Sequence, residues 1–499
     1  MELIDILRQK ILPPVPMEIA KYSSSIESDK LLIKPVIEIN KAHIIMLAKQ
    51  DILNKKEATS ILKTLSEIPP DMMLDPLFED VHMQIESYLI GKLGEEVGGR
   101  LHVAKSRNDQ VATAIRMNLR TYLLEIVQSL IELRTTLLIR CDEYLEAVMP
   151  GYTHLQHAQP ITIAHHLIAH HDALERNTKR VMDAFSFVNL SPMGACALAT
   201  TSFNINRELV AELLGFDGLI ENSVDAVSSR DFVVDVLADY ALIMTNLSRM
   251  GEETILWNTS EFSTVILPDT YVSTSSIMPQ KRNPVVAELL RAKTAHVYGD
   301  LIATLTILKA LPLSYNLDLQ EITPHLWNSH TVTLTSIKMA TGIFKNLKFD
   351  IQRWIELVTD DFSTATELTD MLVREYDLPF RTAYTIVGKI VQKTASEGKK
   401  MKAITPEMLS TTILGTIDKK IQIDPSKFYA ALNPVENVNT KSVIGGPSSI
   451  EVLRMKNKRA KKIVTDEAWY NTHISKLKKA NSVLCSMIKM LEGGEKTES

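Results

Sequence analysis

Residues 273–284, with the sequence STSSIMPQKRNP, combine side chains that could abstract a proton. Two hydroxyls, an ammonium and two carboxamides lie between Ser275 and Asn283, and the prolines predict a loop rather than a helix. A serine can remove a weakly acidic C–H proton beside a carboxylate only if its alkoxide is stabilised. Backbone N–H groups and the Lys281 ammonium could supply that stabilisation. Composition alone favours an ordinary surface loop rich in Ser and Pro. Other motifs are therefore needed to choose between a catalytic loop and a surface loop.

Two further polar clusters occur earlier in the chain. Residues 151–160, GYTHLQHAQP, place His154 among hydroxyl and amide groups that could fix its tautomer and hold a substrate carboxylate. Residues 106–110, SRNDQ, join the Arg107 guanidinium, which suits bidentate carboxylate binding, to several hydrogen-bonding side chains. Each cluster has a plain structural alternative, because a lone histidine is usually structural and the second cluster could simply cap a helix.

Long stretches without Gly or Pro flank these clusters, at residues 111–149, 161–191 and 219–250. Apolar residues recur in them at helical spacing, which predicts long helices and an all-α fold. A helix over the whole first stretch would be on the order of 55 to 60 Å long, more than a compact monomer of this size needs. Its broad apolar arc must be covered by neighbouring helices or partner chains, which predicts an oligomeric bundle.

The chain divides into three predicted segments because 499 residues exceed one hydrophobic core. Residues 1–104 are expected to form shorter helices. Residues 105–355 form the central long-helix bundle with the serine loop, and residues 356–499 form a C-terminal helical domain. The last residues, 493–499, are expected to be disordered.

Composition excludes several classes of partner. A formal net charge of -5 and a pI near 6.3 give no footprint for nucleic acid. The three cysteines show neither a disulfide framework nor metal-ligand spacing, which fits a reducing compartment. The first residues are acidic and lack the pattern of a secretory signal, and no apolar run approaches the ~18 residues of a membrane span. We therefore expect a cytoplasmic protein without a membrane partner.

Taken in order, the motifs resemble the fumarase and aspartase superfamily and, most closely, the argininosuccinate lyase family. That family's loop pattern, GSSxMPxKxNP, is matched from Ser275 onward. The resemblance covers roughly residues 20–455. The other matching segments are GRLH at 99–102, SRNDQ at 106–110, THLQ at 153–156, SRDF at 229–232, LSYN at 313–316 and DLQE at 318–321.

The resemblance implies a three-domain, all-α chain that assembles into a homotetramer around a bundle of about twenty helices. It implies that each active site is shared between three chains. The implied reaction is the release of fumarate from an N-substituted succinate such as argininosuccinate. The substrate is a small dicarboxylate, and neither a cofactor nor a metal is implied.

The resemblance also assigns roles. Ser275 is the expected base that removes the Cβ proton, while Lys281 and Asn283 bind the carboxylate on which charge develops. His154, with Glu288 as its carboxylate partner, lies near the leaving nitrogen, and the sequence leaves open whether His154 itself protonates that nitrogen. The remaining residues expected to bind the substrate are Ser25, Ser106, Arg107, Asn108, Thr153, Arg230, Tyr315 and Gln320.

Several positions depart from the family pattern. Thr274 stands where the family has glycine, and Leu317 and Thr323 replace two customary lysines, one of them near the amino-acid end of the substrate. Asp29 and Asp80, in contrast, match acidic positions near the site. We expect the proton-abstracting groups to be kept and the leaving-group end to be altered. The open alternatives are a lyase for another N-substituted aspartate, such as ethylenediamine disuccinate, and an inactive structural paralogue.

His166 and His170 have the i, i+4 spacing that could bind a divalent metal on one face of a helix. The sequence shows no third ligand, and the chemistry of the family uses no metal. No metal site is therefore expected here.

Overall fold

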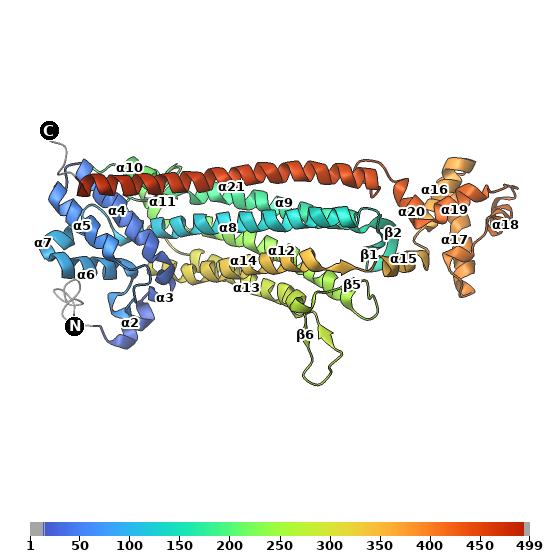
Figure 1. Ribbon diagram of the computed structural model, residues 1–499, viewed down its shortest axis with the longest axis horizontal. Helices are drawn as coiled ribbons and strands as arrows, with labels where there is room; N and C mark the ends of the chain where they lie inside the picture. Colours follow the sequence, from blue (N-terminus) through green and yellow to red (C-terminus); the bar gives the residue numbers. More distant parts are fainter. Residues whose placement is uncertain (1–12, 14, 494–499) are drawn as a thin grey trace.

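The computed structural model describes residue 13 and residues 15–493, which form an elongated and almost entirely helical rod (Figure 1). Long helices run side by side along its middle, N-terminal helices cover one end and a small helical unit forms the other. The all-α prediction is confirmed. Residues 494–499 of the predicted disordered tail lie outside the described residues, as do the first residues, on which the secretory-signal expectation was based.

The middle of the rod is a bundle around α8, which packs against α9, α14 and the C-terminal helix. Because it has neighbours on several sides, α8 buries residues around most of its circumference, including the guanidinium of Arg134. The bundle helices are α8 (Arg107–Glu143), α9 (Ile163–Val188), α12 (Asp231–Asn258), α13 (Val285–Leu308) and α14 (Ile322–Asn346).

The predicted helical stretches differ from the structure at their ends. The first helix begins at Arg107 and ends at Glu143, so the expectation of helix to 149 was wrong. Tyr144 leaves the helical region, and a strand containing Pro150, which fits a strand edge better than a helix interior, follows at Val148–Thr153. The third stretch is also interrupted, because Arg230 adopts a φ of −135° and α12 starts only after it.

The N-terminal helices pack on the end of the bundle where α8 begins, and they share one hydrophobic core with it. They are α2 (Met17–Ser23), α3 (Ile26–Asp29), α4 (Ile33–Lys49), α5 (Lys55–Glu67), α6 (Val81–Leu93) and α7 (Glu95–Gly98), with 3₁₀ turns at Lys30–Leu32, Pro76–Phe78 and Gly99–His102.

Short strands and helices connect the long helices. Strands β1 (Val148–Thr153) and β2 (Gln156–Thr162) form an antiparallel hairpin between α8 and α9, with a register shift after Pro150. A second hairpin, β6 (Ser273–Thr274) with β7 (Arg282–Asn283), projects from the side of the rod (Figure 1). The other connecting elements are β3 (Leu190–Ser191) parallel to β4 (Gly218–Leu219), β5 (Val265–Ile266) antiparallel to β8 (Lys348–Phe349), α10 (Arg207–Leu214), α11 (Ser223–Ser228) and 3₁₀ turns at Asp269–Tyr271 and Leu317–Glu321.

The segment predicted as a C-terminal domain has two structural parts. Residues between 362 and 432 form a core of their own at the far end of the rod. Helix α21 (Ser449–Glu492) then returns along the bundle to the N-terminal helices and joins their core. The remaining helices are α15 (Ile351–Thr359), α16 (Ala365–Tyr376), α17 (Phe380–Ser396), α18 (Pro406–Ile417), α19 (Pro425–Leu432) and α20 (Pro434–Asn439), with a 3₁₀ turn at Met401–Ala403. Among the described residues, no helix has both the length and the apolar character required to cross a bilayer.

Candidate active site

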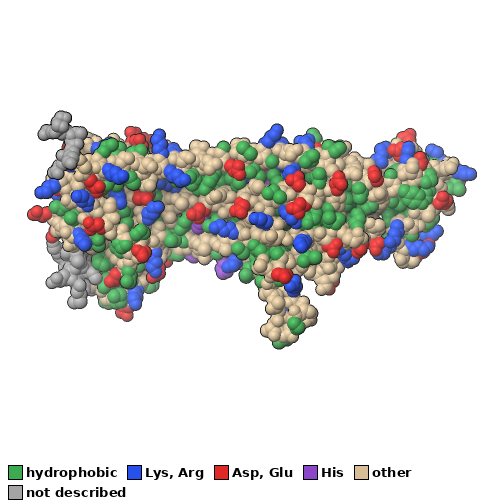
Figure 2. Space-filling model, in the orientation of Figure 1, with side chains coloured by type: hydrophobic (Ala, Val, Ile, Leu, Met, Phe, Trp, Pro, Cys, Tyr) green, Lys and Arg blue, Asp and Glu red, His purple; other side chains and the backbone are tan. Residues whose placement is uncertain are grey.

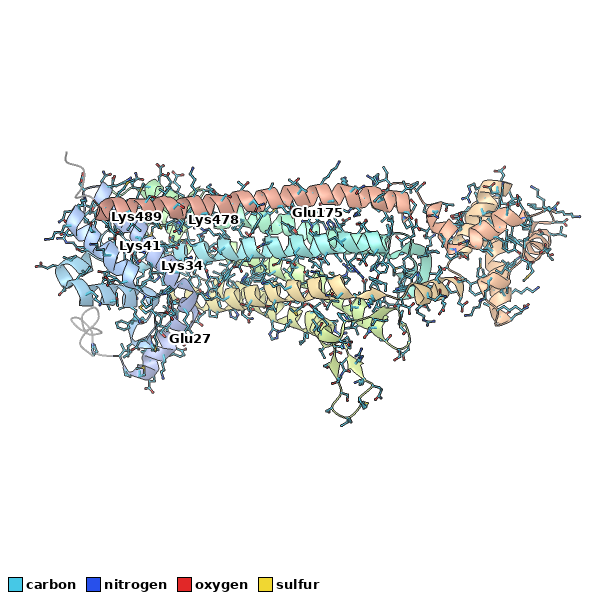
Figure 3. All side chains as sticks on the ribbon, viewed as in Figure 1. Glu27, Lys34, Lys41, Glu175, Lys478 and Lys489 are labelled. Carbon is cyan, nitrogen blue, oxygen red and sulfur yellow. The ribbon has the colours of Figure 1, made fainter. Side chains whose placement is uncertain are left out.

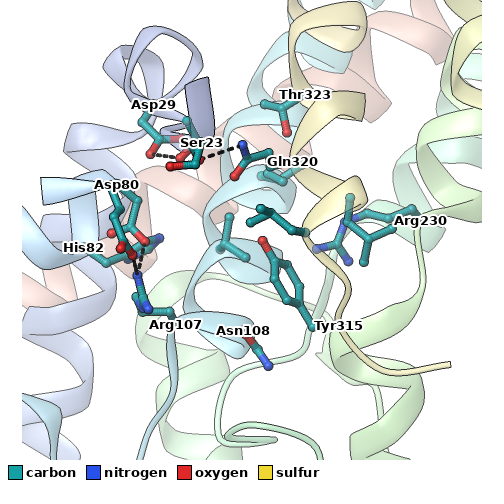
Figure 4. Close-up of a pocket in the computed structure, with 16 residues that line it drawn as sticks. Ser23, Asp29, Asp80, His82, Arg107, Asn108, Arg230, Tyr315, Gln320 and Thr323 are labelled. Atoms are coloured by element: carbon teal, nitrogen blue, oxygen red, sulfur yellow. Dashed lines mark hydrogen bonds and ion pairs between the residues drawn. The ribbon is translucent and has the colours of Figure 1, made fainter. Parts of the chain in front are cut away.

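A polar pocket lies where the N-terminal helices meet the start of α8 and the segment before α14 (Figure 4). Predicted substrate-binding residues from four separate parts of the chain line it together: Ser25, Arg107, Asn108, Arg230, Tyr315 and Gln320. The rest of the lining consists of Ser23, Asp29, Glu79, Asp80, His82, Val111, Ile115, Leu317, Leu319 and Thr323. The fold thus brings distant polar segments to one concave site, which is the usual setting for a small ligand.

The first turn of α8 places Arg107 and Asn108 in the pocket. Ser106 Oγ accepts the N–H of Asn108 at 3.3 Å, and the Asp109 carboxylate accepts the N–H of Ser106 at 3.0 Å, which forms a capping box. The other oxygen of Asp109 accepts two backbone N–H groups of the 192–201 loop, at 3.0 and 2.8 Å. Ser106 therefore serves as the cap and is not part of the pocket lining. The positive end of the α8 dipole makes this wall suitable for a carboxylate.

Arg107 forms ion pairs with two acidic residues on its own side of the pocket. Its Nη1 lies 2.9 Å from Oδ2 of Asp80 and 3.2 Å from Oε2 of Glu79 (Figure 4). Burial opposes the charged form of Arg107, but the two carboxylates outweigh this effect and raise its pKa. The guanidinium is therefore held charged and in place, where it could donate to a substrate carboxylate with its remaining N–H groups.

The opposite wall contains Arg230, Tyr315 and Gln320. Arg230 is only 3% exposed, and burial lowers its pKa to about 10, so it stays charged at neutral pH. Burial also raises the pKa of Tyr315, which keeps its hydroxyl protonated and able to donate a hydrogen bond. Gln320 Nε2 donates to the carbonyl of Ser23 at 3.1 Å. This wall offers donors and one fixed positive charge.

Asp29 provides an acidic group at the N-terminal side. Its Oδ2 accepts the hydroxyl of Ser25 at 2.7 Å and the N–H of Val81 at 3.2 Å. Burial raises the pKa of Asp29 to about 7, with a smaller contribution from the charge of Asp80, while the two hydrogen bonds oppose the rise. Asp29 therefore changes its protonation state near neutral pH.

The raised pKa of Asp29 predicts a pH-dependent stability. Its pKa in the folded chain, about 7, exceeds the ordinary 3.8, so the stability gained from protonated Asp29 is full below pH 3.8 and is lost as the pH rises through 7. We expect Asp29→Asn to stabilise the protein by about 4 kcal/mol at pH 8 relative to wild type, because the pKa rises from 3.8 to about 7, and much less at pH 4. Thermal unfolding at the two pH values measures this. Asp71→Asn, at an exposed aspartate, is the control, and an equal effect of Asp29→Asn at both pH values would contradict the prediction.

The family departures fall partly inside the pocket. Leu317 and Thr323, which replace customary lysines, both line it, so the pocket lacks two ammonium groups that the resemblance would place there. Lys105, at a position where the resemblance would place an arginine, lies outside the lining. It is buried beside Asn40, to which its ammonium donates, and burial lowers its pKa to about 7. The positive charge on the pocket walls therefore comes from arginines.

His154 and Thr153 lie on the β1–β2 hairpin, away from the pocket. The turn residues His154 and Leu155 have φ values of 55° and 57°, the left-handed conformation of a two-residue hairpin turn. Such turns usually use Asn or Gly, so a histidine and a leucine here are strained. The side chains of Thr153, His154 and Leu155 are exposed at the tip. This hairpin was not predicted, because the usual turn residues are absent.

Ser275, Lys281 and Asn283 lie on the β6–β7 hairpin, which confirms the predicted loop. Ser275 Oγ accepts backbone N–H groups from Ile277 at 3.3 Å and Met278 at 3.1 Å. These donors point at the oxygen that would carry charge as an alkoxide. Lys281 is exposed, and Glu288 is exposed on the first turn of α13.

Within one chain the three clusters do not meet. The pocket lies at the N-terminal end of the bundle, the serine hairpin projects from its side and the β1–β2 hairpin lies at its other end (Figure 1). Ser275, Lys281, Asn283, Thr153, His154 and Glu288 are therefore absent from the pocket that holds Arg107.

Sequence reasoning missed several pocket residues. His82 lines the pocket, and burial lowers its pKa to about 4, so its imidazole is neutral. Ser23 and Glu79 also line it. His82 and Glu79 flank Asp80 in the sequence EDVH, and that polar cluster before an apolar stretch was the available signal. Nothing in the sequence marked Ser23.

Comparisons with known proteins agree over most of the chain. A family model described as "Lyase" matches residues 12–299, and one described as "Argininosuccinate lyase C-terminal" matches residues 362–439. The argininosuccinate lyase of Methanocaldococcus jannaschii is 46% identical over 473 residues, 94% of this chain and 96% of that protein. That of Methanosarcina acetivorans is 46% identical over 451 residues, 90% of this chain and 91% of that protein.

Solved structures show the same fold. The crystal structure of EDDS lyase in complex with formate has a TM-score of 0.86 at 29% identity and covers 93% of this chain and 92% of its own. The class II fumarase from Schistosoma mansoni has a TM-score of 0.70 at 18% identity and covers 82% of this chain and 90% of its own.

Proposed function

The chain belongs to the argininosuccinate lyase family of the fumarase and aspartase superfamily, and we propose that it cleaves argininosuccinate into arginine and fumarate. It is a carbon–nitrogen lyase. The observation that carries the proposal is the pocket that gathers Arg107, Asn108, Arg230 and Gln320 around one polar cavity. It offers separate guanidinium groups and a helix N-terminus for the carboxylates of the substrate.

The elimination follows from the chemistry of the two hairpins. Ser275 removes the Cβ proton of the succinyl part, and the electron pair is delocalised into the neighbouring carboxylate, near the Lys281 ammonium and Asn283. The C–N bond then breaks, the pair forms the double bond of fumarate, and the leaving nitrogen receives a proton. His154, with Glu288 beside it, is the group proposed near that nitrogen. The two backbone N–H groups that Ser275 Oγ already accepts support its role as the base.

A complete site requires other copies of the chain, and we propose a homotetramer. Helix α13 exposes large apolar side chains at helical spacing: Leu289, Tyr298, Ile302 and Leu305, which are 49%, 41%, 63% and 47% exposed. Figure 2 shows further hydrophobic side chains along the visible side of the rod. A long helix with such a face favours burial against another copy. Partner chains would supply the two hairpins to each pocket.

We also propose that the protein is cytoplasmic. The three cysteines form no disulfide, as expected in a reducing compartment. We also propose that residues 105–355 act as one functional unit, since the three motif clusters at 106–110, 151–160 and 273–284 all lie within it.

The activity is tested by the ultraviolet absorbance of released fumarate with argininosuccinate as substrate. We expect turnover, and no fumarate from argininosuccinate at any enzyme concentration would overturn the proposal. The second candidate function is cleavage of a different N-substituted aspartate. Rates of fumarate release from a panel of such compounds, including ethylenediamine disuccinate, rank it against cleavage of argininosuccinate. That candidate is favoured by Leu317 and Thr323 in the pocket and by the similar EDDS lyase structure, whereas the relatives at 46% identity favour argininosuccinate. Fumarate from neither substrate would support the inactive paralogue.

A further inference from the structure

Two histidines and a glutamate form a compact cluster on the bundle, outside the candidate active site. His166 and His170 lie one turn apart on α9, and Glu253 reaches them from the neighbouring helix α12. Glu253 Oε2 accepts Nε2–H of His166 at 2.8 Å and Nε2–H of His170 at 2.7 Å. The three candidate ligand atoms lie within 4.8 Å of one another. Glu253 is the third group that the sequence did not reveal.

We propose that His166, His170 and Glu253 bind a divalent transition-metal ion, and that Zn²⁺ is the ion that fits best. Two imidazole nitrogens and a carboxylate oxygen are a common ligand set for zinc, which leaves the fourth tetrahedral position to water. Ligand atoms at about 2.1 Å from a tetrahedral ion are about 3.4 Å apart. The present 2.7 and 2.8 Å contacts would therefore open by only about 0.6 to 0.7 Å, a shift available to these side chains.

The surroundings suit a bound ion. The side chains of His166, His170 and Glu253 are 24%, 11% and 31% exposed, so the cluster is open to solvent on one side. On the other side His166 packs edge to face on Trp257, with ring centroids 5.3 Å apart. When Nε2 binds Zn²⁺, the proton on that nitrogen either moves to Nδ1 of the same ring or is released to solvent. No other reactant is required.

A nearby cluster provides a contrast. His171, Asp172 and Glu175 also lie close together on α9. Figure 3 shows Glu175 beside α21. There, however, Arg459 Nη2 lies 2.5 Å from Asp172 and Arg134 Nη2 lies 3.5 Å from Glu175. Cationic side chains already occupy the positions where an ion would bind. At the proposed site no ion pair from Lys or Arg to Glu253 occurs among the described residues.

The test uses the full chain, treated with chelator and dialysed. Titration calorimetry with Zn²⁺ should show one ion per chain, and Co²⁺ should give the visible absorption of a tetrahedral site. Glu253→Gln, which keeps an acceptor oxygen for the histidines, and His170→Gln should each weaken Zn²⁺ binding by at least about 10-fold, the loss typical even of groups outside the coordination shell. His165→Gln is the matched control, because His165 is partly exposed on the same helix and its Nε2 lies 3.0 Å from the Gly445 carbonyl oxygen, outside the proposed ligand set.

Absence of Zn²⁺ binding to wild type would overturn the proposal, as would binding that Glu253→Gln and His170→Gln leave unchanged. Far-ultraviolet circular dichroism distinguishes loss of the site from loss of the fold. If a variant unfolds, Co²⁺ absorption of His166→Cys in the folded chain gives a second measurement, since a thiolate ligand would add an intense charge-transfer band. No such band in folded, Co²⁺-loaded His166→Cys would equally contradict the site.

Discussion

Replacement of Ser275 by alanine should lower kcat for fumarate release by about 100- to 10,000-fold, the contribution typical of a positioned base. The reason is local: Ser275 Oγ is the acceptor of two backbone N–H groups on the β6–β7 hairpin, and alanine leaves these donors without the oxygen that they stabilise. KM should change little, because Ser275→Ala removes none of the groups proposed to hold the substrate, among them Lys281 and Asn283 on the same hairpin. Steady-state kinetics by fumarate absorbance measure both.

Ser276→Ala is the matched control for Ser275→Ala. Ser276 is exposed on the same hairpin, so this variant tests whether any change in the loop reduces activity. We expect it to retain most of the wild-type kcat, and sedimentation should show both variants in the same assembly as wild type. Turnover by Ser275→Ala at the wild-type rate would show that another group removes the proton.

Long stretches without Gly or Pro, in which apolar residues recur at helical spacing, predicted the long helices. Burial on several sides of α8 widens its apolar arc, which is why the stretch indicated neighbours on more than one side. Their ends were harder to predict. Tyr144 and Arg230 end or interrupt helices through backbone conformation alone, and neither residue type breaks helices strongly. The return of α21 along the bundle depends on contacts between residues more than 300 positions apart, such as Arg134 with Asp466, which no local pattern reveals.

The site shows the same division between local and distant information. Motif spacing identified Arg107 and Asn108, and the capping box of Ser106 and Asp109 explains why they point into the pocket. Ser23 was not identified, because it is the last residue of α2 and stands in an ordinary run of serines, residues 23–25. The sequence also could not show that Glu253 faces the histidines of α9, since this depends on how two helices pack.

Mixing two inactive variants should restore activity if each site combines different chains. In a single chain the Arg107 pocket and the Ser275 hairpin lie apart along the rod, so we propose that one chain supplies the pocket and another the serine. Ser275→Ala and Arg107→Gln should each be nearly inactive alone. When equal amounts assemble at random, a site has a native pocket with probability one half and a native hairpin with probability one half. Activity should then recover to about one quarter of wild type.

The informative control pairs Ser275→Ala with Lys281→Met, because both residues lie on one hairpin of one chain. No mixed assembly can contain a hairpin with both native residues, so co-expression of these variants should recover nothing. Tagged copies purified in two affinity steps ensure that only mixed assemblies are assayed. The expected result is that activity recovers when Ser275→Ala is paired with Arg107→Gln and does not recover when it is paired with Lys281→Met. This result requires that the pocket and the serine come from different chains. Equal recovery in both pairs, or none in either, is incompatible with a site shared in this way, whatever the number of chains in the assembly.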